Sequence, residues 1–309
     1  MYSHFNCTFV TKISNNTVIL KQKIQAYNLF TKFRLSFLVI VSAVLGYYFE
    51  NGKTDTTLLL LIFGGLLVTA ASNGSNQIWE RELDKLMKRT AGRPLPMGTM
   101  SQTEAYLIVI ISLVSGTFML YCINATCAVL GFASYVAYVF LYTPMKRMSP
   151  WAVFVGAFPG AMPPLLGAIA ANNQFGIVPG ILFFIQFMWQ FPHFWAIAWV
   201  AFDDYKAGGF SLLPYKEGKC KNTAFQIVLY TLILIPISIL PWLFGWTGIP
   251  SLIIVSLCGL FFFLYAYRLF LTLDDKAARK LMFASFIYLP VVQLAHVLDR
   301  LPKVTELLN

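Results

Sequence analysis

The chain has 309 residues, of which 58% are hydrophobic, 16% are aromatic and only 12% are charged. A soluble domain usually carries about 25% charged residues, so this composition excludes a soluble globular enzyme and an intrinsically disordered protein. The formal net charge is +10, yet so apolar a chain is not a nucleic-acid binder, and its basic residues need another explanation.

The N-terminal segment differs from the rest of the chain. The first 28 residues contain no Asp, Glu or Arg and are rich in Ser, Thr and Asn. We expect residues 1–28 to form a disordered basic tail, since the absence of Arg argues against the alternative, a transit peptide. No soluble domain is recognisable further on. Residues 29–309 are therefore predicted to be a single membrane-embedded domain.

Charged residues divide the remaining chain into long uncharged runs. A membrane-spanning helix needs about 20 apolar residues, so the runs hold one, one, two, two, two and one spans in chain order. The predicted fold class is an all-α, polytopic integral membrane protein with about nine transmembrane helices. Turns inside the double runs are expected at 124–126, 172–173 and 245–248. The runs are 35–49, 56–79, 105–145, 148–202, 222–267 and 281–298.

Lys and Arg are distributed unevenly between the two sides that nine helices would define. Of the 23 basic residues, 20 fall on the side of the N-terminus, and only Lys53, Arg300 and Lys303 fall on the other. By the positive-inside rule the first side is cytoplasmic, or matrix in a mitochondrion. We expect a cytoplasmic N-terminus and an outer C-terminus. The short tail favours the bacterial plasma (inner) membrane over the mitochondrial inner membrane.

The inner segment after the second span begins with a row of oxygen ligands. Asn76, Glu80 and Asp84 lie at i, i+4 and i+8, and because each step drifts only about 40° around a helix, the three share one face. Such ligands suit Mg²⁺ together with phosphate oxygens, which Arg side chains also bind. A salt-bridged interfacial helix end is the alternative interpretation. The neighbouring bases are Arg81, Lys85, Lys88, Arg89 and Arg93.

The segment after the fourth span contains a second group of polar residues, Tyr142, Lys146 and Arg147. Tyr142 and Lys146 share a face only if this stretch is helical, and Pro144 leaves that open. The alternative interpretation is that the two basic residues contribute only to the positive-inside charge.

The remaining candidate site residues are an ionisable residue inside the membrane, His193, and a pair of acids, Asp203 and Asp204. His193 lies ten residues before Asp203, which is about 15 Å along a helix. Ionisable groups at such depth are candidates for function, although a buried His bonded to Gln190 or to a backbone carbonyl is an acceptable structural alternative. Asp203 and Asp204 come directly after the sixth predicted span, and the acidic row that begins at Asn76 comes at the end of the second span. This predicts two similar halves that face one cavity.

Together these residues resemble the UbiA superfamily of intramembrane prenyltransferases, over roughly residues 28–298. The first acidic motif of that superfamily is Asn-x-x-x-Asp/Glu-x-x-x-Asp, and a second element is Tyr-x-x-x-Lys. The block Trp-Gln-x-Pro-His-Phe is specific to one branch, the protohaem IX farnesyltransferases. The matching positions are Asn76, Glu80, Asp84, Tyr142, Lys146 and the block 189–194.

The resemblance implies a Mg²⁺-dependent enzyme that transfers a farnesyl group from farnesyl diphosphate to a vinyl group of protohaem IX (haem b), giving haem O. The implied catalytic residues and metal ligands are Asn76, Glu80, Asp84, Asp203 and Asp204. Because the family's second motif is usually Asp-x-x-x-Asp, which of Asp203 and Asp204 binds metal stays open. His193, also in the catalytic set, would bind the haem or handle a proton. The implied substrate contacts are Arg81, Lys88, Arg89, Arg93, Tyr142, Lys146, Arg147, Trp189 and Gln190.

Departure of diphosphate leaves an allylic cation, which needs a dry pocket with aromatic ring faces. Trp79, Phe187, Trp189 and Trp195 are the candidates. Expected partners are the two substrates and the lipid bilayer, with no nucleic acid. By resemblance alone, haem A synthase or oxidase assembly factors are further partners.

Two other functions are compatible with parts of the pattern. An aromatic quinone precursor could be the prenyl acceptor with the same diphosphate machinery, but the block containing His193 argues against it. A polytopic transporter would have acids spread through its spans and helices broken near the middle of the membrane. Here the acids gather at the inner helix ends beside the bases, which favours the enzyme.

Overall fold

A computed structural model describes residues 21–302, so the first 20 residues of the predicted tail, and Lys303, lie outside the described residues. Residues 21–28 of that predicted tail belong to a helix, Lys21–Thr31. Within the described part of the chain all regular elements are helices, and one isolated β-bridge joins Thr247 to Arg300. The all-α fold class is confirmed.

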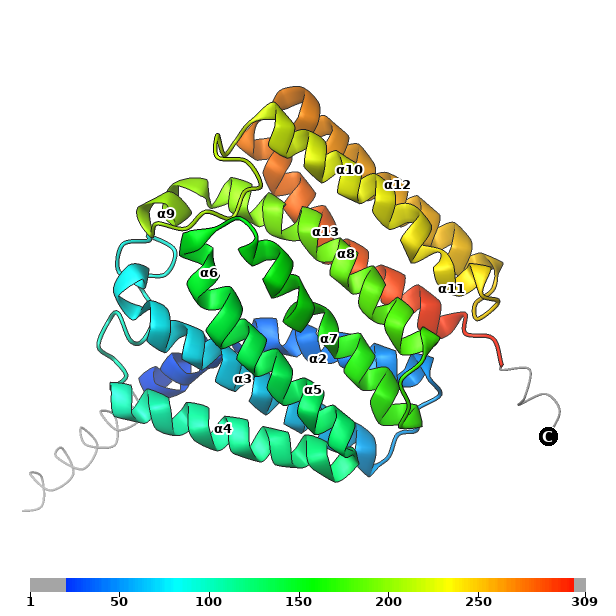
Figure 1. Ribbon diagram of the computed structural model, residues 1–309, viewed down its shortest axis with the longest axis horizontal. Helices are drawn as coiled ribbons and strands as arrows, with labels where there is room; N and C mark the ends of the chain where they lie inside the picture. Colours follow the sequence, from blue (N-terminus) through cyan, green and yellow to red (C-terminus); the bar gives the residue numbers. More distant parts are fainter. Residues whose placement is uncertain (1–20, 303–309) are drawn as a thin grey trace, which may run out of the picture.

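The main helices run side by side through the molecule, with the N-terminal helices forming one half and the C-terminal helices the other (Figure 1). After the helix Lys21–Thr31 they are α2 (Phe33–Phe49), α3 (Thr56–Asp84), α4 (Gln102–Ile123), α5 (Ala125–Val136), the π-helix η1 (Ala137–Tyr142), α6 (Thr143–Met148), α7 (Ala152–Asn172), α8 (Ile177–Val200), α9 (Phe202–Ala207), α10 (Lys221–Ser238), α11 (Leu240–Leu243), α12 (Ile249–Thr272) and α13 (Asp275–Leu298).

Among the described residues, eight segments are long and apolar enough to cross a membrane. A ninth is obtained if Lys21–Thr31 and α2, which meet at 50°, count as one span. The prediction of about nine membrane helices is therefore confirmed. Two spans are composite, because α5, η1 and α6 run together as Ala125–Met148, and α10 continues through α11 as Lys221–Leu243.

Each predicted turn inside a double run coincides with a helix break. Helix α4 ends at Ile123, α7 ends at Asn172 and α11 ends at Leu243. Asn124 forms the first break because its side-chain oxygen accepts the N–H of Cys127 at 2.7 Å and so caps α5. Asn is among the preferred residues for this role, since its short side chain reaches an N–H that has no partner inside the helix.

The break before α2 is held by two amide side chains of α3. Lys32, between the two helices, has the left-handed backbone conformation with φ 48°. Helix ends leave carbonyl groups without intrahelical donors. Here Gln77 donates to the carbonyls of Leu29 and Phe30, and Asn73 donates to that of Thr31. This arrangement fixes Lys32 at one end of the cavity described below.

Glycines allow α2 and α7 to approach closely. A side chain at Gly46 would overlap the backbone of Pro164, and one at Gly167 would overlap the backbone of Ala43. Membrane helices lack a hydrophobic driving force between them, and small residues let their backbones pack tightly instead. The contact brings α2 and α7 together as two walls of the same cavity.

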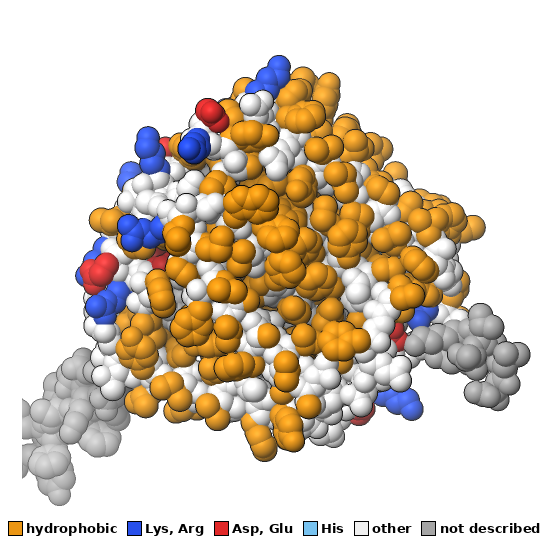
Figure 2. Space-filling model, viewed as in Figure 1, with side chains coloured by type: hydrophobic (Ala, Val, Ile, Leu, Met, Phe, Trp, Pro, Cys, Tyr) orange, Lys and Arg blue, Asp and Glu red, His pale blue; other side chains and the backbone are white. Residues whose placement is uncertain are grey.

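The outer surface is mostly apolar, as Figure 2 shows for one face. Lys and Arg gather along one edge, where α9 and the loop after α3 lie, and only a few lie at the opposite end (Figures 1 and 2). Exposed large apolar side chains on α4, α10 and α12 cover the long sides of the bundle. An apolar surface of this extent on membrane-length helices defines a multi-span membrane protein.

Candidate active site

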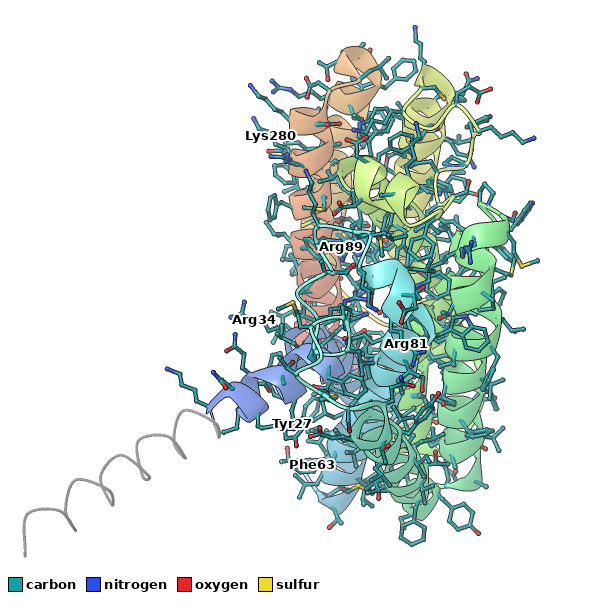
Figure 3. The ribbon with its side chains drawn as sticks, turned by 90° about the vertical axis from the view of Figure 1, so that its left-hand side faces the viewer. Tyr27, Arg34, Phe63, Arg81, Arg89 and Lys280 are labelled. Carbon is teal, nitrogen blue, oxygen red and sulfur yellow. The ribbon has the colours of Figure 1, made fainter. Side chains whose placement is uncertain are left out.

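A cavity of about 450 Å³ lies between the two halves of the bundle. Its walls come from α2, α3, η1, α7, α8 and α13, and its polar end lies where α3 ends in the following loop. That end is at the charged edge of the molecule, where Arg89 lies near the middle of the face shown in Figure 3. The charged and amide side chains of α2 to α6 that line it are Lys32, Asn73, Asn76, Glu80, Asp84, Arg89, Arg93 and Lys146.

The acidic row on α3 lies in this polar end. Asn76, Glu80 and Asp84 are all buried and all line the cavity, as the spacing of four residues predicts for one helix face. Asn76 is oriented by a hydrogen bond from its Nδ2 to Thr143 Oγ1 at 3.2 Å, which leaves its carbonyl oxygen as a possible ligand. Three hard oxygen donors on one buried face fit the preference of Mg²⁺.

Each carboxylate of the row has a cation from another segment. Lys146 Nζ lies 2.6 Å from Glu80 Oε1, and Arg93 Nη1 lies 2.7 Å from Asp84 Oδ2 and 2.8 Å from its Oδ1. All four side chains are largely shielded from solvent. A charge buried without its partner is strongly destabilising. The two pairs therefore tie α3 to α6 and to the loop after α3.

Pro144 does not interrupt the helical stretch that carries Lys146. The chain runs through the π-helix η1 into α6, and Pro144 stands in the first turn of α6. Proline has no N–H for a carbonyl one turn earlier, and the wider π-turn is where the helix accommodates this loss. Tyr142 and Lys146 consequently both line the cavity, and the Lys146 ammonium lies 4.8 Å from the centre of the Tyr142 ring.

The other predicted basic contacts divide into two groups. Arg89 lines the cavity and lies over the ring of Tyr205 at 5.5 Å. Burial raises the pKa of Tyr205, so this phenol stays neutral. Arg81, Lys88 and Arg147 are not among the described residues that line the cavity. Arg81 instead pairs with Glu82, its neighbour on α3, at 3.2 Å.

The second acidic pair lies on the short helix α9, outside the cavity lining. The carboxylate of Asp204 accepts the backbone N–H groups of Lys88 and Arg89, each at 3.2 Å, and so holds the loop after α3 against α9. Asp203 is exposed. Within residues 21–302, no three Asp, Glu, His or Cys side chains lie together as a metal cluster. The two acidic motifs are thus not assembled into one set of ligands.

The block 189–194 on α8 borders the same cavity farther from the acids. Trp189, Gln190 and His193 all line it. The side chain of Gln190 donates to the Ala157 carbonyl at 2.9 Å, and His193 Nδ1 lies 2.8 Å from the hydroxyl of Ser285 on α13. The proposed structural bond between His193 and Gln190 is therefore not the one that forms.

Among the four aromatic candidates for a cation-stabilising ring, only Trp189 lines the cavity. Trp79 is 54% exposed on the outside of α3, while Phe187 and Trp195 are buried in the hydrophobic core without reaching the cavity. Composition does not distinguish an inward from an outward Trp in an apolar helix, because both the core and the lipid accept the ring. The rings that face the cavity beside Trp189 include Tyr138, Tyr142 and Phe194.

The side chains of the cavity lining that were absent from the sequence-based set include Lys32, Tyr138 and Tyr205. Lys32 precedes the first predicted span, and Tyr205 directly follows the acidic pair Asp203 and Asp204, so their positions beside predicted elements are a signal that could have identified them. No comparable signal exists for Tyr138. Its place in the lining depends on the π-turn, which the sequence pattern does not predict.

The wall of the cavity between α2 and α13 reaches the outer surface. Leu35 and Leu38 on α2 are 48% and 50% exposed, and Phe286 on α13 is 40% exposed, yet all three also line the cavity. These side chains are apolar and stand on membrane-spanning segments. The cavity therefore borders the lipid on this side.

A bundle of membrane-length helices around a cavity with buried carboxylates and cations at one end defines the class of intramembrane prenyl-transferring enzymes. The model of the UbiA prenyltransferase family matches residues 38–289. The chain belongs to the UbiA prenyltransferase family.

Curated relatives refine this comparison. The chain is 49% identical over 285 residues to the protoheme IX farnesyltransferase of Cytophaga hutchinsonii, covering 91% of this chain and 100% of that one. It is 49% identical over 276 residues to the protein of that name from Christiangramia forsetii, covering 87% and 91%. The chain therefore spans almost the whole length of these bacterial relatives.

Solved structures share the fold at low sequence identity. A structure of digeranylgeranylglyceryl phosphate synthase in membranes has a TM-score of 0.74 at 21% identity, covering 90% of this chain and 98% of that one. A UbiA homologue from Archaeoglobus fulgidus bound to GPP and Mg²⁺ has a TM-score of 0.66 at 15% identity, covering 87% and 99%. Both likenesses support the helical bundle described above.

Proposed function

We propose that the protein transfers the farnesyl group of farnesyl diphosphate to a vinyl group of haem b, giving haem O. The observation that carries the proposal is a single cavity with buried acids and bases at one end and the Trp189–His193 block farther along. The end with the acids and bases has the side chains that bind a diphosphate together with its metal ion. The names of the bacterial relatives support haem as the acceptor.

Asn76, Glu80 and Asp84 are the residues that would hold Mg²⁺, which supplies positive charge to the leaving diphosphate. Arg93, Lys146 and Arg89 present cations at the same end of the cavity, where they bind diphosphate oxygens. In the second acidic pair, Asp204 positions the loop that carries Arg89, because it accepts two backbone N–H groups there. Asp203 does not line the cavity, but its exposed carboxylate is not used to hold this loop, so by elimination it is the member of the pair that we assign to contact with the metal-bound diphosphate.

The reaction breaks the bond between the farnesyl C1 and the diphosphate oxygen and forms a carbon–carbon bond to the outer vinyl carbon of haem. Diphosphate departs with the electron pair of the broken bond, and a water molecule then adds to the inner vinyl carbon and loses one of its two protons, which leaves a hydroxyl group there. The cation formed along this path must be protected from water until it reacts. Trp189, Tyr138 and Tyr142 are the ring faces that line the cavity for this purpose.

We further propose that the protein lies in the bacterial plasma membrane with its N-terminus in the cytoplasm. The bacterial origin of the relatives and the uneven distribution of Lys and Arg support this location and orientation. The acidic end of the cavity would then face the cytoplasm, where a water-soluble diphosphate head group is accessible. Enzymes or assembly factors that use haem O, such as haem A synthase, are the expected partners.

Haem analysis of membranes tests the proposal. Membranes that contain the wild-type chain should yield a haem heavier by a farnesyl group plus water, and Asp84→Asn should reduce its formation about a hundredfold, as a loss of about 3 kcal/mol of transition-state stabilisation predicts. Glu82→Gln is the matched control, since Glu82 is an exposed acid on the same helix. Prenylation of a quinone precursor with unmodified haem would instead show that the acceptor is wrong.

A further inference from the structure

Ser285 on α13 connects the two rings of the block that borders the cavity. Its hydroxyl lies 2.8 Å from Nδ1 of His193, and its carbonyl oxygen accepts the indole N–H of Trp189 at 3.0 Å. Ser285 itself is fully buried, at 0% exposure, and does not line the cavity. A residue outside the cavity therefore fixes two side chains that form its wall.

The hydrogen bonds of Ser285 determine the tautomer of His193. The Ser285 hydroxyl lies 2.6 Å from the carbonyl oxygen of Met282, to which it donates. A hydroxyl has one proton, so toward His193 the same oxygen acts as acceptor and Nδ1 carries the hydrogen. A neutral imidazole has one N–H and one nitrogen with a lone pair. The lone pair of His193 is therefore on Nε2.

The imidazole ring is also fixed in orientation. The Trp189 ring stacks on it at 4.3 Å with an angle of 18° between the planes, and Phe286 contacts it edge-on at 5.0 Å. Nδ1 faces buried Ser285, so the opposite edge of the ring is the part directed toward the cavity. Nε2 makes no hydrogen bond with any side chain or backbone group in the part of the chain that the structure describes.

We infer that Ser285 is a positioning residue that holds His193 as the Nδ1–H tautomer, so that Nε2 binds the iron of the haem acceptor. Histidine ligands of metals commonly donate their other ring N–H to a nearby acceptor, which fixes the ring and makes it a better ligand. This assignment rests on the proposed function, because it takes haem as the acceptor. It selects iron binding over proton transfer as the role of His193.

Paired porphyrins test the inference on the purified full-length protein. Haem b and metal-free protoporphyrin IX have the same ring and side groups, but only haem offers iron. His193→Ala should abolish the imidazole-bound absorption spectrum of haem and weaken its binding, with no change in the binding of protoporphyrin IX. Ser285→Ala should weaken haem binding about tenfold, as loss of an outer hydrogen-bond partner typically does, and shift the haem absorption band.

Two variants separate positioning from a general loss of structure. Ser285→Thr keeps a hydroxyl that can accept from Nδ1 and should restore haem binding and spectrum. Ser238→Ala is the matched control, because Ser238 is equally buried and its hydroxyl lies 2.7 Å from the hydroxyl of Tyr288 on the same helix α13, without contacting His193. It should leave the haem spectrum as in the wild type.

The outcomes distinguish this inference from the function on which it rests. Equal weakening of both porphyrins by His193→Ala, or an unchanged haem spectrum in Ser285→Ala, would overturn iron binding through Nε2. Farnesyl transfer by the wild-type protein is measured in the same preparation. If the wild-type protein forms haem O while His193→Ala leaves haem binding intact, only the inference fails. If no haem O forms although the haem spectrum shows a bound imidazole, the proposed function fails instead.

Discussion

At the residue scale, neighbouring basic residues of α6 have different environments. Lys146 is buried and pairs with Glu80, whereas Arg147 is exposed and does not line the cavity. The two residues are adjacent and both carry a positive charge. If a substitution lowers activity at Lys146 and not at Arg147, the cause is therefore the position of the side chain in the cavity and not the loss of a positive charge as such. The pair therefore provides an internal comparison for the polar end of the cavity.

We predict that Lys146→Ala reduces kcat/KM for farnesyl diphosphate about a hundredfold, as removal of a preorganised charge contact does. It should also lower stability by about 3–5 kcal/mol, since Glu80 is left buried without its cation. Arg147→Ala should change kcat/KM by less than about threefold, in keeping with small effects of exposed charges. Initial rates at varied farnesyl diphosphate, with thermal unfolding of each variant, provide the measurement. Equal effects of the two substitutions would contradict the assignment.

The acidic residues of α9 supply a second comparison. Asp204→Ala removes the acceptor of two backbone N–H groups, so the amide hydrogens of Lys88 and Arg89 should exchange with solvent faster. Asp203→Ala should leave their exchange rates unchanged but lower the rate of prenyl transfer. Hydrogen exchange followed by mass spectrometry of the peptide that contains residues 85–93 checks both statements. Faster exchange in Asp203→Ala would show that the two roles are reversed.

The residue pattern allowed part of the site to be predicted. Asn76, Glu80 and Asp84 could be placed on one face because helical periodicity is a local property. The partners of Asp204, by contrast, depend on how α9 packs on a loop more than 100 positions away in sequence. Local spacing carries no information about that contact. The exposed position of Trp79 was likewise not predictable, since lipid and protein interior both accept aromatic rings.

At the scale of the elements, the contact between α2 and α7 depends on glycine. A Cβ atom added at Gly167 would overlap the backbone of Ala43. A Cβ atom added at Gly180 on α8 would have no neighbouring atom within 4 Å. We predict that Gly167→Ala destabilises the protein by about 1–3 kcal/mol through overpacking. Gly180→Ala should be neutral or stabilise by up to about 1 kcal/mol, because alanine favours the helix. Unfolding in detergent, monitored by circular dichroism, distinguishes the two variants, and equal stabilities would refute the close approach.

The spans and the turns between them were predictable from the sequence, whereas the bend at Lys32 and the π-turn before α6 were not. The lengths of uncharged runs define the spans because a membrane of fixed thickness sets the length of an apolar helix. The bend at Lys32 follows from hydrogen bonds that Asn73 and Gln77 donate across to another helix. The π-turn before Pro144 similarly has no signature in hydropathy. Both irregular features shape the cavity, so the elements least accessible to sequence patterns are the ones that position the site.

At the scale of the whole molecule, the distribution of charge predicts orientation. Lys53, on the loop between α2 and α3, and Met148, at the end of α6, are both exposed and lie on opposite sides of the proposed membrane position. The test uses spheroplasts, in which the outer membrane has been removed and the plasma membrane is intact. In a cysteine-free background, a membrane-impermeant thiol reagent should label Lys53→Cys but not Met148→Cys. Detergent permeabilisation should make both reactive. Labelling of Met148→Cys alone before permeabilisation would reverse the orientation.

The lipid-facing wall at Leu35, Leu38 and Phe286 affects how reactants are supplied. If the proposed function holds, a farnesyl chain or a porphyrin dissolved among the lipid tails can reach the cavity by diffusing in the plane of the bilayer, without passing through water. The concentration that governs turnover is then the number of reactant molecules per lipid and not per litre. Additional phospholipid at constant total volume lowers the number of reactant molecules per lipid, so it should slow the enzyme as much as an equivalent decrease in the amount of reactant.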